Sequence, residues 1–120
     1  MSRLFTAREL SRLHRAWMSL ETARHTGAEF DPMPVVKWFT PDAGATWLVA
    51  AVDPAQRTAF GVCDLGLGFV EIGEIDMSEL RALRGRLGLP VERDRWFRPD
   101  RSLWSYQRDG LTCPPVVPRS

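Results

Sequence analysis

Two groups of residues have side-chain types and a spacing that could form a binding or catalytic site. In the first, Lys37 and Trp47 lie on the two strands of a predicted hairpin, and Asp42 lies in the turn between them. A lysine and a carboxylate beside an indole could hold a small polar ligand. Together with Glu71, they could also serve a small enzyme that uses a carboxylate as general acid or base. The structural alternative is that Asp42 accepts from amides of its own turn while Lys37 is solvated.

The second group is a charged stretch that ends in tryptophan: Glu92, Arg93, Asp94, Arg95 and Trp96. In an extended strand, Glu92 and Asp94 share one face and the arginines share the other. Arg93 could then bind a phosphate or a partner's carboxylate with its planar guanidinium. The alternative is an internal ion-pair network that fastens this stretch to the sheet, with Glu71 or Glu74 as a partner.

No motif in the sequence identifies a catalytic or cofactor site. The GxSxG, P-loop, HExxH and dinucleotide-binding glycine patterns do not occur. Cys63 and Cys113 lie far apart, and neither has the CxxC or Cys/His spacing of a zinc site, so we expect two free thiols. We therefore predict no cofactor and no metal, and we assign no catalytic residue.

Length and composition indicate one folded domain over residues 1–120. The chain has 120 residues, of which 44% are hydrophobic and 26% are charged, and its five tryptophans each bury a large area. That is enough for a single core. The sequence opens with Met1 to Phe5 and runs at once into charged residues, and it contains no long apolar run. We therefore expect neither a signal peptide nor a membrane span, and we place the protein in the cytoplasm.

The formal net charge of +1 hides a segmental pattern. Residues 1–26 carry five arginines against two acids, residues 27–80 carry nine acids against two basic residues, and residues 81–101 carry seven arginines against three acids. Such asymmetry fits a basic nucleic-acid face, or two basic segments that neutralise an acidic sheet. Neutralisation is the interpretation that we favour.

The N-terminal segment, residues 1–26, has the signature of an amphipathic helix. Thr6 and Glu9 fit a capping box, and leucines and tryptophan recur at helical spacing from Leu10 onward. The pattern predicts a helix from about Ala7 to Arg24 that ends before Gly27.

Four short strands are predicted next, over residues 35–40, 46–52, 58–63 and 69–75. The turns between them are too short for a crossover helix, so the sheet should be an antiparallel meander. Asp76 should cap a short second helix that ends near Gly85 or Gly88, with Leu83, Leu87 and Leu89 continuing its apolar contact. From Val91 an edge strand or extended arm follows, and residues 99–120 read as an extended tail. The fold class is therefore α+β.

The chain also resembles an uncharacterised family, domain of unknown function 2958. The similar stretches are residues 37–42, 46–47, 71–73 with 78–80, and 87–94, which together span a family-like core over residues 35–97. That family usually carries an acidic residue shortly after the second tryptophan strand, where this sequence has Ala50 and Ala51 and keeps only Asp53 beyond. The resemblance implies a small accessory protein associated with plasmids and other mobile DNA, and it supplies no catalytic residues.

Three functions are compatible with these features. The first is a non-enzymatic module that binds a protein partner or a second copy of itself. The second is nucleic-acid binding by the arginines of the first helix and of the arm, where aromatic residues next to arginines could stack on bases. The third is the small enzyme with a carboxylate and lysine site.

Overall fold

The first helix, α1 (Ala7–Thr26), begins with the predicted capping box. The Thr6 hydroxyl accepts from the Glu9 amide at 3.1 Å, and the Glu9 carboxylate accepts from the Thr6 amide at 2.8 Å. The helix ends at Gly27, which adopts a left-handed conformation with φ of 76°. That end lies two residues beyond the predicted Arg24, because glycine can form the cap where other residues would be strained.

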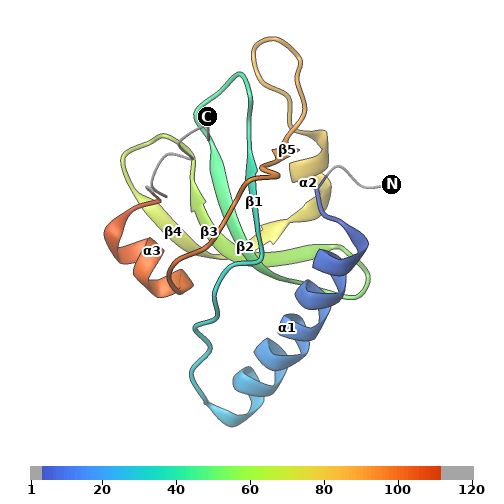
Figure 1. Cartoon of the computed structure of the whole chain (residues 1–120), viewed down its shortest axis with the longest axis vertical. Coiled ribbons are helices and arrows are strands. Elements are labelled where there is room, and N and C mark those ends of the chain that lie inside the picture. Colours follow the sequence, from blue (N-terminus) through green and yellow to red (C-terminus); the bar gives the residue numbers. More distant parts are fainter. Residues whose placement is uncertain (1–3, 112–120) are drawn as a thin grey trace.

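A five-stranded antiparallel sheet forms the centre of the computed structural model, which describes residues 4–111 (Figure 1). The strand order is β4-β3-β2-β1-β5, so β4 and β5 are the edges. The strands are β1 (Val36–Phe39), β2 (Thr46–Val52), β3 (Thr58–Asp64), β4 (Val70–Asp76) and β5 (Glu92–Arg93). The α+β class and the predicted meander are confirmed, and the stretch after Val91 adds a fifth strand.

Both faces of the sheet are covered. On one face Trp38 and Val49 pack with Leu13 of α1 and with Leu80 of the second helix, α2 (Met77–Ala82). On the other face Leu48 and Val62 pack against the third helix, α3 (Leu103–Asp109), and a cluster around Trp17 and Ala51 continues the contact of α1. Trp17 and Trp38 are therefore both buried, at 8% and 0% exposure.

Helix α2 is shorter than predicted. Asp76 caps it as expected, but the helix ends at Ala82 because Leu83 turns to an extended conformation with ψ of 136°. Beyond this point the Gly85 amide donates to the Leu89 carbonyl, so the chain forms a loop. Leu87 is 79% exposed and Leu89 39% exposed, so the prediction that they continue the apolar contact of α2 is wrong.

Helix α3 lies where the sequence analysis expects an extended tail, and for residues 103–109 that expectation is wrong. Ser102 caps the helix by accepting from the Ser105 amide, and the turn buries Leu103 and Tyr106 against the sheet. A serine cap before two apolar residues three apart is a sequence signal of a short helix, which the prolines on either side of it obscured. Residues 112–120 of the predicted tail, with Cys113, lie outside the described residues.

None of the helices within residues 4–111 is long and apolar enough to cross a membrane.

Candidate functional site

The sheet separates the first group of predicted site residues. Lys37 pairs with Leu48 and Trp47 pairs with Trp38 in the register of β1 and β2. Residues paired across strands share a face and neighbours alternate, so Lys37 and Trp47 project from opposite faces. Lys37 instead lies 3.7 Å from the Asp94 carboxylate. The structure therefore does not bring Lys37 and Trp47 together in one site.

Asp42 joins two loops. Its Oδ2 atom accepts from the Leu87 amide at 2.5 Å, and its Oδ1 atom is buried with no hydrogen-bond partner among the described residues. The carboxylate packs so closely on Gly85 that a side chain there would overlap it. Asp42 thus holds the loop after α2 against the turn between β1 and β2.

The charged stretch of the second group is largely paired within the molecule. Arg93 lies 3.3 Å from the Glu9 carboxylate, and Asp94 pairs with Lys37. An internal network is therefore present, with Glu9 in place of the suggested Glu71 or Glu74 as the partner of Arg93. The carboxylate of Asp94 also accepts from the Trp96 amide at 2.8 Å.

Three members of this second group remain exposed. Glu92 lies on the surface of β5, and Trp96 is 66% exposed. The Arg95 guanidinium lies 5.9 Å from the centre of the Trp96 ring, within the range of a cation–π contact. These side chains are free to meet a partner, whereas Arg93 and Asp94 already hold β5 to its neighbours.

The two remaining predicted residues, Trp47 and Glu71, line one hollow. The register places Trp47 opposite Cys63 and Cys63 opposite Glu71, so the three form a row across β2, β3 and β4 on one face. With residues of α2 they border a hollow of about 390 Å³ that is open to solvent. We call it the acidic groove; its lining includes Trp47, Cys63, Glu71, Gly73, Glu79 and Leu83.

Two paired glycines lie beside this row and leave the groove free of side chains there. Gly61 pairs with Gly73 across β3 and β4. A side chain on Gly61 would overlap the Leu48 carbonyl, which explains the glycine structurally. At Gly73, by contrast, a Cβ atom would meet no atom of residues 4–111 within 4 Å. Gly73 can therefore accept a side chain that would fill the groove without disturbing the fold.

Among the residues that the structure describes, four carboxylates line the groove, and no lysine or arginine does. Glu74 pairs with Arg24 at 2.8 Å, and Asp76 accepts from two amides at the start of α2. The carboxylates of Glu71 and Glu79 have no hydrogen bond or ion pair with another described residue. The groove therefore carries uncompensated negative charge.

The Cys63 thiol lies in this negative environment. Burial first, then the charges of Glu71 and Asp64, raise the pKa of Cys63 from 9.0 to about 11. The thiol is consequently protonated at neutral pH and is a poor nucleophile. This argues against covalent chemistry at Cys63.

The edges of the groove are apolar. Leu65 and Leu83 line it and are 51% and 39% exposed, while Trp47 and Leu80 form its buried part. Leu67 and Phe69, in the same turn as Leu65, are also more than half exposed. Exposed apolar side chains next to a hollow are typical of binding surfaces.

Sequence reasoning missed Cys63, Gly73 and Glu79 as parts of this site. Counting residues back from the two hairpin turns would have placed Cys63 beside Trp47, since register fixes which residues share a face. No local signal would have placed Glu79, because its position depends on how α2 packs on the sheet.

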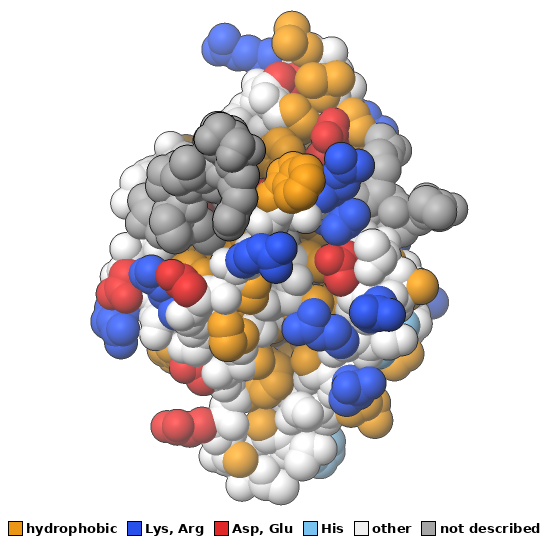
Figure 2. All heavy atoms as spheres, viewed as in Figure 1, with side chains coloured by type: hydrophobic (Ala, Val, Ile, Leu, Met, Phe, Trp, Pro, Cys, Tyr) orange, Lys and Arg blue, Asp and Glu red, His pale blue; other side chains and the backbone are white. Residues whose placement is uncertain are grey.

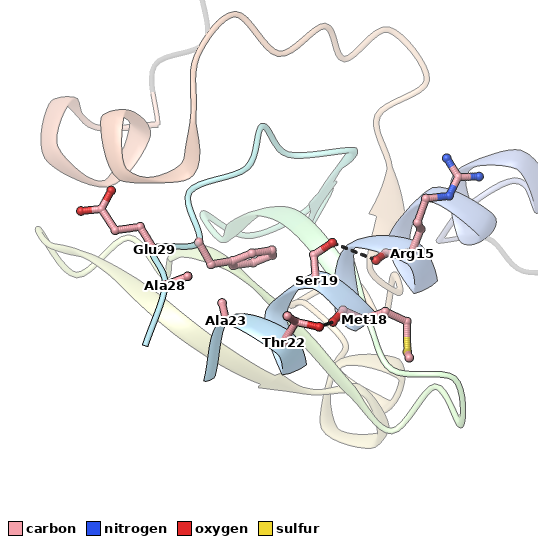
Figure 3. Close-up of a pocket in the computed structure, with 8 residues that line it drawn as sticks. Arg15, Met18, Ser19, Thr22, Ala23, Ala28 and Glu29 are labelled. Atoms are coloured by element: carbon pink, nitrogen blue, oxygen red, sulfur yellow. Dashed lines mark hydrogen bonds between the residues drawn. The ribbon is translucent and has the colours of Figure 1, made fainter. Parts of the chain in front are cut away.

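A second hollow, also of about 390 Å³, lies between the C-terminal half of α1 and the segment around Phe30 (Figure 3). Its two hydroxyl groups are engaged within the helix: Ser19 donates to the Arg15 carbonyl and Thr22 to the Met18 carbonyl. It is shallower than the acidic groove, and its side chains do not converge on a common point.

A basic surface covers a further part of the molecule. Figure 2 shows Lys and Arg side chains gathered over the face that carries α1 and the segment of residues 93–101. Exposed arginines of α1 and of that segment are Arg8, Arg12, Arg15, Arg24, Arg95 and Arg98. No cluster of three or more potential metal ligands occurs within residues 4–111.

The whole described fold, and with it every residue of the acidic groove, falls within a match to one family model. Residues 5–111 match the family described as Protein of unknown function (DUF2958). Comparisons with curated proteins and with solved structures give no match. The match extends well beyond the family-like core predicted from the sequence and confirms the resemblance. The chain therefore belongs to the DUF2958 family, whose function is unknown.

Proposed function

We propose that the chain is a small non-enzymatic module that binds a protein partner through the acidic groove. The observation that carries this proposal is an open hollow in which buried Trp47, a free space above Gly73 and exposed leucines at the edge lie together. An apolar surface of this kind loses contact with water when a partner covers it, which favours binding.

A small-molecule or catalytic site is supported less well. A volume of about 390 Å³ is near the lower end of the roughly 300–1,000 Å³ of ligand sites, and the groove is open where such sites enclose most of the ligand. The acid–lysine enzyme of the sequence analysis needs Lys37, which lies on the other face of the sheet. We further propose that this module acts in the cytoplasm as an accessory protein encoded on mobile DNA, as expected from the sequence resemblance.

The test is to fill the groove and compare captured proteins. Gly73→Val places a β-branched side chain in the free space, and Gly44→Val makes the same change in an open turn outside the groove. Tagged wild-type chain and both variants would be used to capture proteins from a lysate of the encoding organism, with quantification by mass spectrometry. We expect one protein to be retained by wild type and by Gly44→Val, and to fall at least tenfold with Gly73→Val. Equal capture by all three folded chains would refute the proposal.

A second candidate function is nucleic-acid binding by the basic surface. It is favoured by exposed Trp96 beside Arg95, since an aromatic ring can stack on a base while arginines contact phosphates. Replacing Arg95, Trp96 and Arg98 with serine should then weaken retention on single-stranded DNA. Retention that does not fall between low and moderate salt would exclude phosphate contacts.

A further inference from the structure

We propose that the partner segment held by the acidic groove is basic and carries a large apolar anchor: a stretch of polypeptide in which lysine or arginine flanks leucine, isoleucine or an aromatic residue. This inference rests on the proposed function and specifies the chemistry of its partner. The groove offers two complementary features, an apolar floor for the anchor and carboxylates around it for the flanking charges.

The floor determines where the anchor lies. Gly73 contributes no side chain, and the space above it is bordered by Trp47 and Leu80, which are 5% and 4% exposed. An apolar side chain placed there would enter a groove whose lining includes the exposed Leu65 and Leu83, and would be partly removed from water. A polar side chain would find no donor or acceptor on the glycine row apart from the strands' own backbone.

The charges determine what flanks the anchor. Glu71 lies on β4 and Glu79 on α2, so the two unpaired carboxylates come from two different elements that line the groove. Within residues 4–111, no basic residue lines the groove to neutralise them. Burial and, next, the charge of Glu71 raise the pKa of the Cys63 thiol, so this carboxylate lies close to a group inside the groove. A basic segment would meet attractive charge on both sides, and an acidic segment would be repelled.

The edge strand makes a heterologous partner more favourable than a symmetric dimer through the same edge. Strand β4 has no neighbouring strand on its outer side among the described strands, and Gln107 of α3 donates to its Val70 carbonyl, so an extended segment can approach the edge beyond Val70. The strand itself carries Glu71, Glu74 and Asp76. Two such strands brought side by side would place like charges close together, which opposes pairing between two copies.

Three octapeptides of fixed composition test the partner chemistry directly. In the first peptide, every second residue is leucine and the residues between are lysine or arginine. The second peptide keeps the leucines and replaces the basic residues with glutamate. The third keeps the basic residues and replaces each leucine with serine. Binding to the full chain would be measured by calorimetry, and the site by shifts of the backbone amide NMR signals of Cys63, Glu71 and Gly73.

We expect the basic and apolar peptide to bind at least tenfold more tightly than either of the others, with affinity that falls as salt rises. Glu71→Gln combined with Glu79→Gln should weaken that peptide by about threefold to tenfold, an effect of the size expected for two exposed charge pairs. Gly73→Val should abolish the amide shifts, and Gly44→Val should leave them unchanged.

The failures of the two proposals can be told apart. If the acidic peptide binds as well as the basic one, or if no peptide shifts the groove signals, the partner chemistry is wrong. The proposed function would still stand in that case if Gly73→Val removes the captured protein. If Gly73→Val captures the same proteins as wild type, the proposed function itself is refuted, and the partner chemistry with it. A concentration-dependent dimer in sedimentation experiments that Gly73→Val dissolves would assign the groove to a second copy of the chain, and so overturn the heterologous partner.

Discussion

Asp42 and Leu87 are joined by a hydrogen bond of 2.5 Å between the aspartate Oδ2 atom and the leucine amide, although 45 residues separate them in the sequence. This bond links the β1–β2 turn to the loop that follows α2. The aspartate's position in a turn predicts hydrogen bonds to local amides. The structure shows a long-range use of the same carboxylate, and Gly85 is what allows the close approach.

In a double-mutant cycle at Asp42 and Gly85, the effect of Gly85→Ala on the free energy of unfolding should depend on the residue at position 42. Asp42→Ala should lower the free energy of unfolding by about 1–2 kcal/mol, because the Leu87 amide loses its acceptor. Gly85→Ala should also destabilise the wild-type chain, since the new side chain overlaps the carboxylate. In the Asp42→Ala background the same substitution should be neutral, or stabilise the fold by about 0.4–1 kcal/mol. Gly85 does not have a positive φ, so alanine fits its backbone without strain, and alanine also lowers the conformational entropy of the unfolded chain. Urea unfolding followed by tryptophan fluorescence measures all four chains; an equal cost of Gly85→Ala in both backgrounds would contradict the assignment.

The elements with local signals were predictable, and the site was not. The capping box at Thr6 and Glu9 and the aspartate cap at Asp76 depend on residues three or fewer apart, so the sequence reveals them. Short hairpin turns also fix which strands pair. The acidic groove instead depends on the early end of α2 at Ala82 and on two glycines that meet across strands. Both are tertiary relationships with no local sequence pattern.

The charged stretch after Val91 illustrates the same limit. Its alternation correctly predicts that Arg93 and Asp94 face different ways, but their partners lie on other elements. Arg93 meets Glu9 of α1, which already closes the capping box. The choice between an internal ion-pair network and an open site depends on which residues of other elements lie nearby, and no local sequence pattern reveals that.

Glu9 has two roles that substitutions can separate. One carboxylate oxygen accepts from the Thr6 amide, and the other lies 3.3 Å from Arg93. Glu9→Gln retains an acceptor for the cap and weakens the pair, so we expect a loss of about 0.5 kcal/mol or less. Glu9→Ala removes both contacts and should cost about 1–2 kcal/mol. Thermal and urea unfolding compare the variants, with Glu29→Gln on the exposed surface as a control. A glutamine variant as unstable as the alanine variant would mean that the ion pair dominates.

Asp100 should make stability depend on acid pH. Hydrogen bonds from Arg101, and next from Tyr106, lower the pKa of Asp100 below its ordinary value of 3.8. A carboxyl whose pKa is lowered by folding stabilises the fold above its unfolded pKa, and this contribution is lost as pH falls through the folded pKa. The difference in unfolding free energy between wild type and Asp100→Asn should therefore be largest near pH 7 and shrink below about pH 3.8. A difference that is constant from pH 7 to pH 2.5 would contradict the lowered pKa.

The Cys63 thiol reports on the charge of the acidic groove. A pKa of about 11, against an ordinary 9.0, leaves about a hundredfold less thiolate at pH 8, so alkylation by iodoacetamide should be slower by about that factor than for an unperturbed thiol. Glu71→Gln should accelerate it a few-fold, because the lost negative charge no longer opposes thiolate formation while burial, the larger cause, remains. Glu74→Gln changes the same strand at a residue that does not contribute to the pKa of Cys63, and serves as the matched control. The rates would be measured by mass spectrometry in a Cys113→Ser background. If Glu71→Gln and Glu74→Gln react at the same rate, the field of Glu71 does not reach the thiol, and the charge argument for a basic partner loses its support.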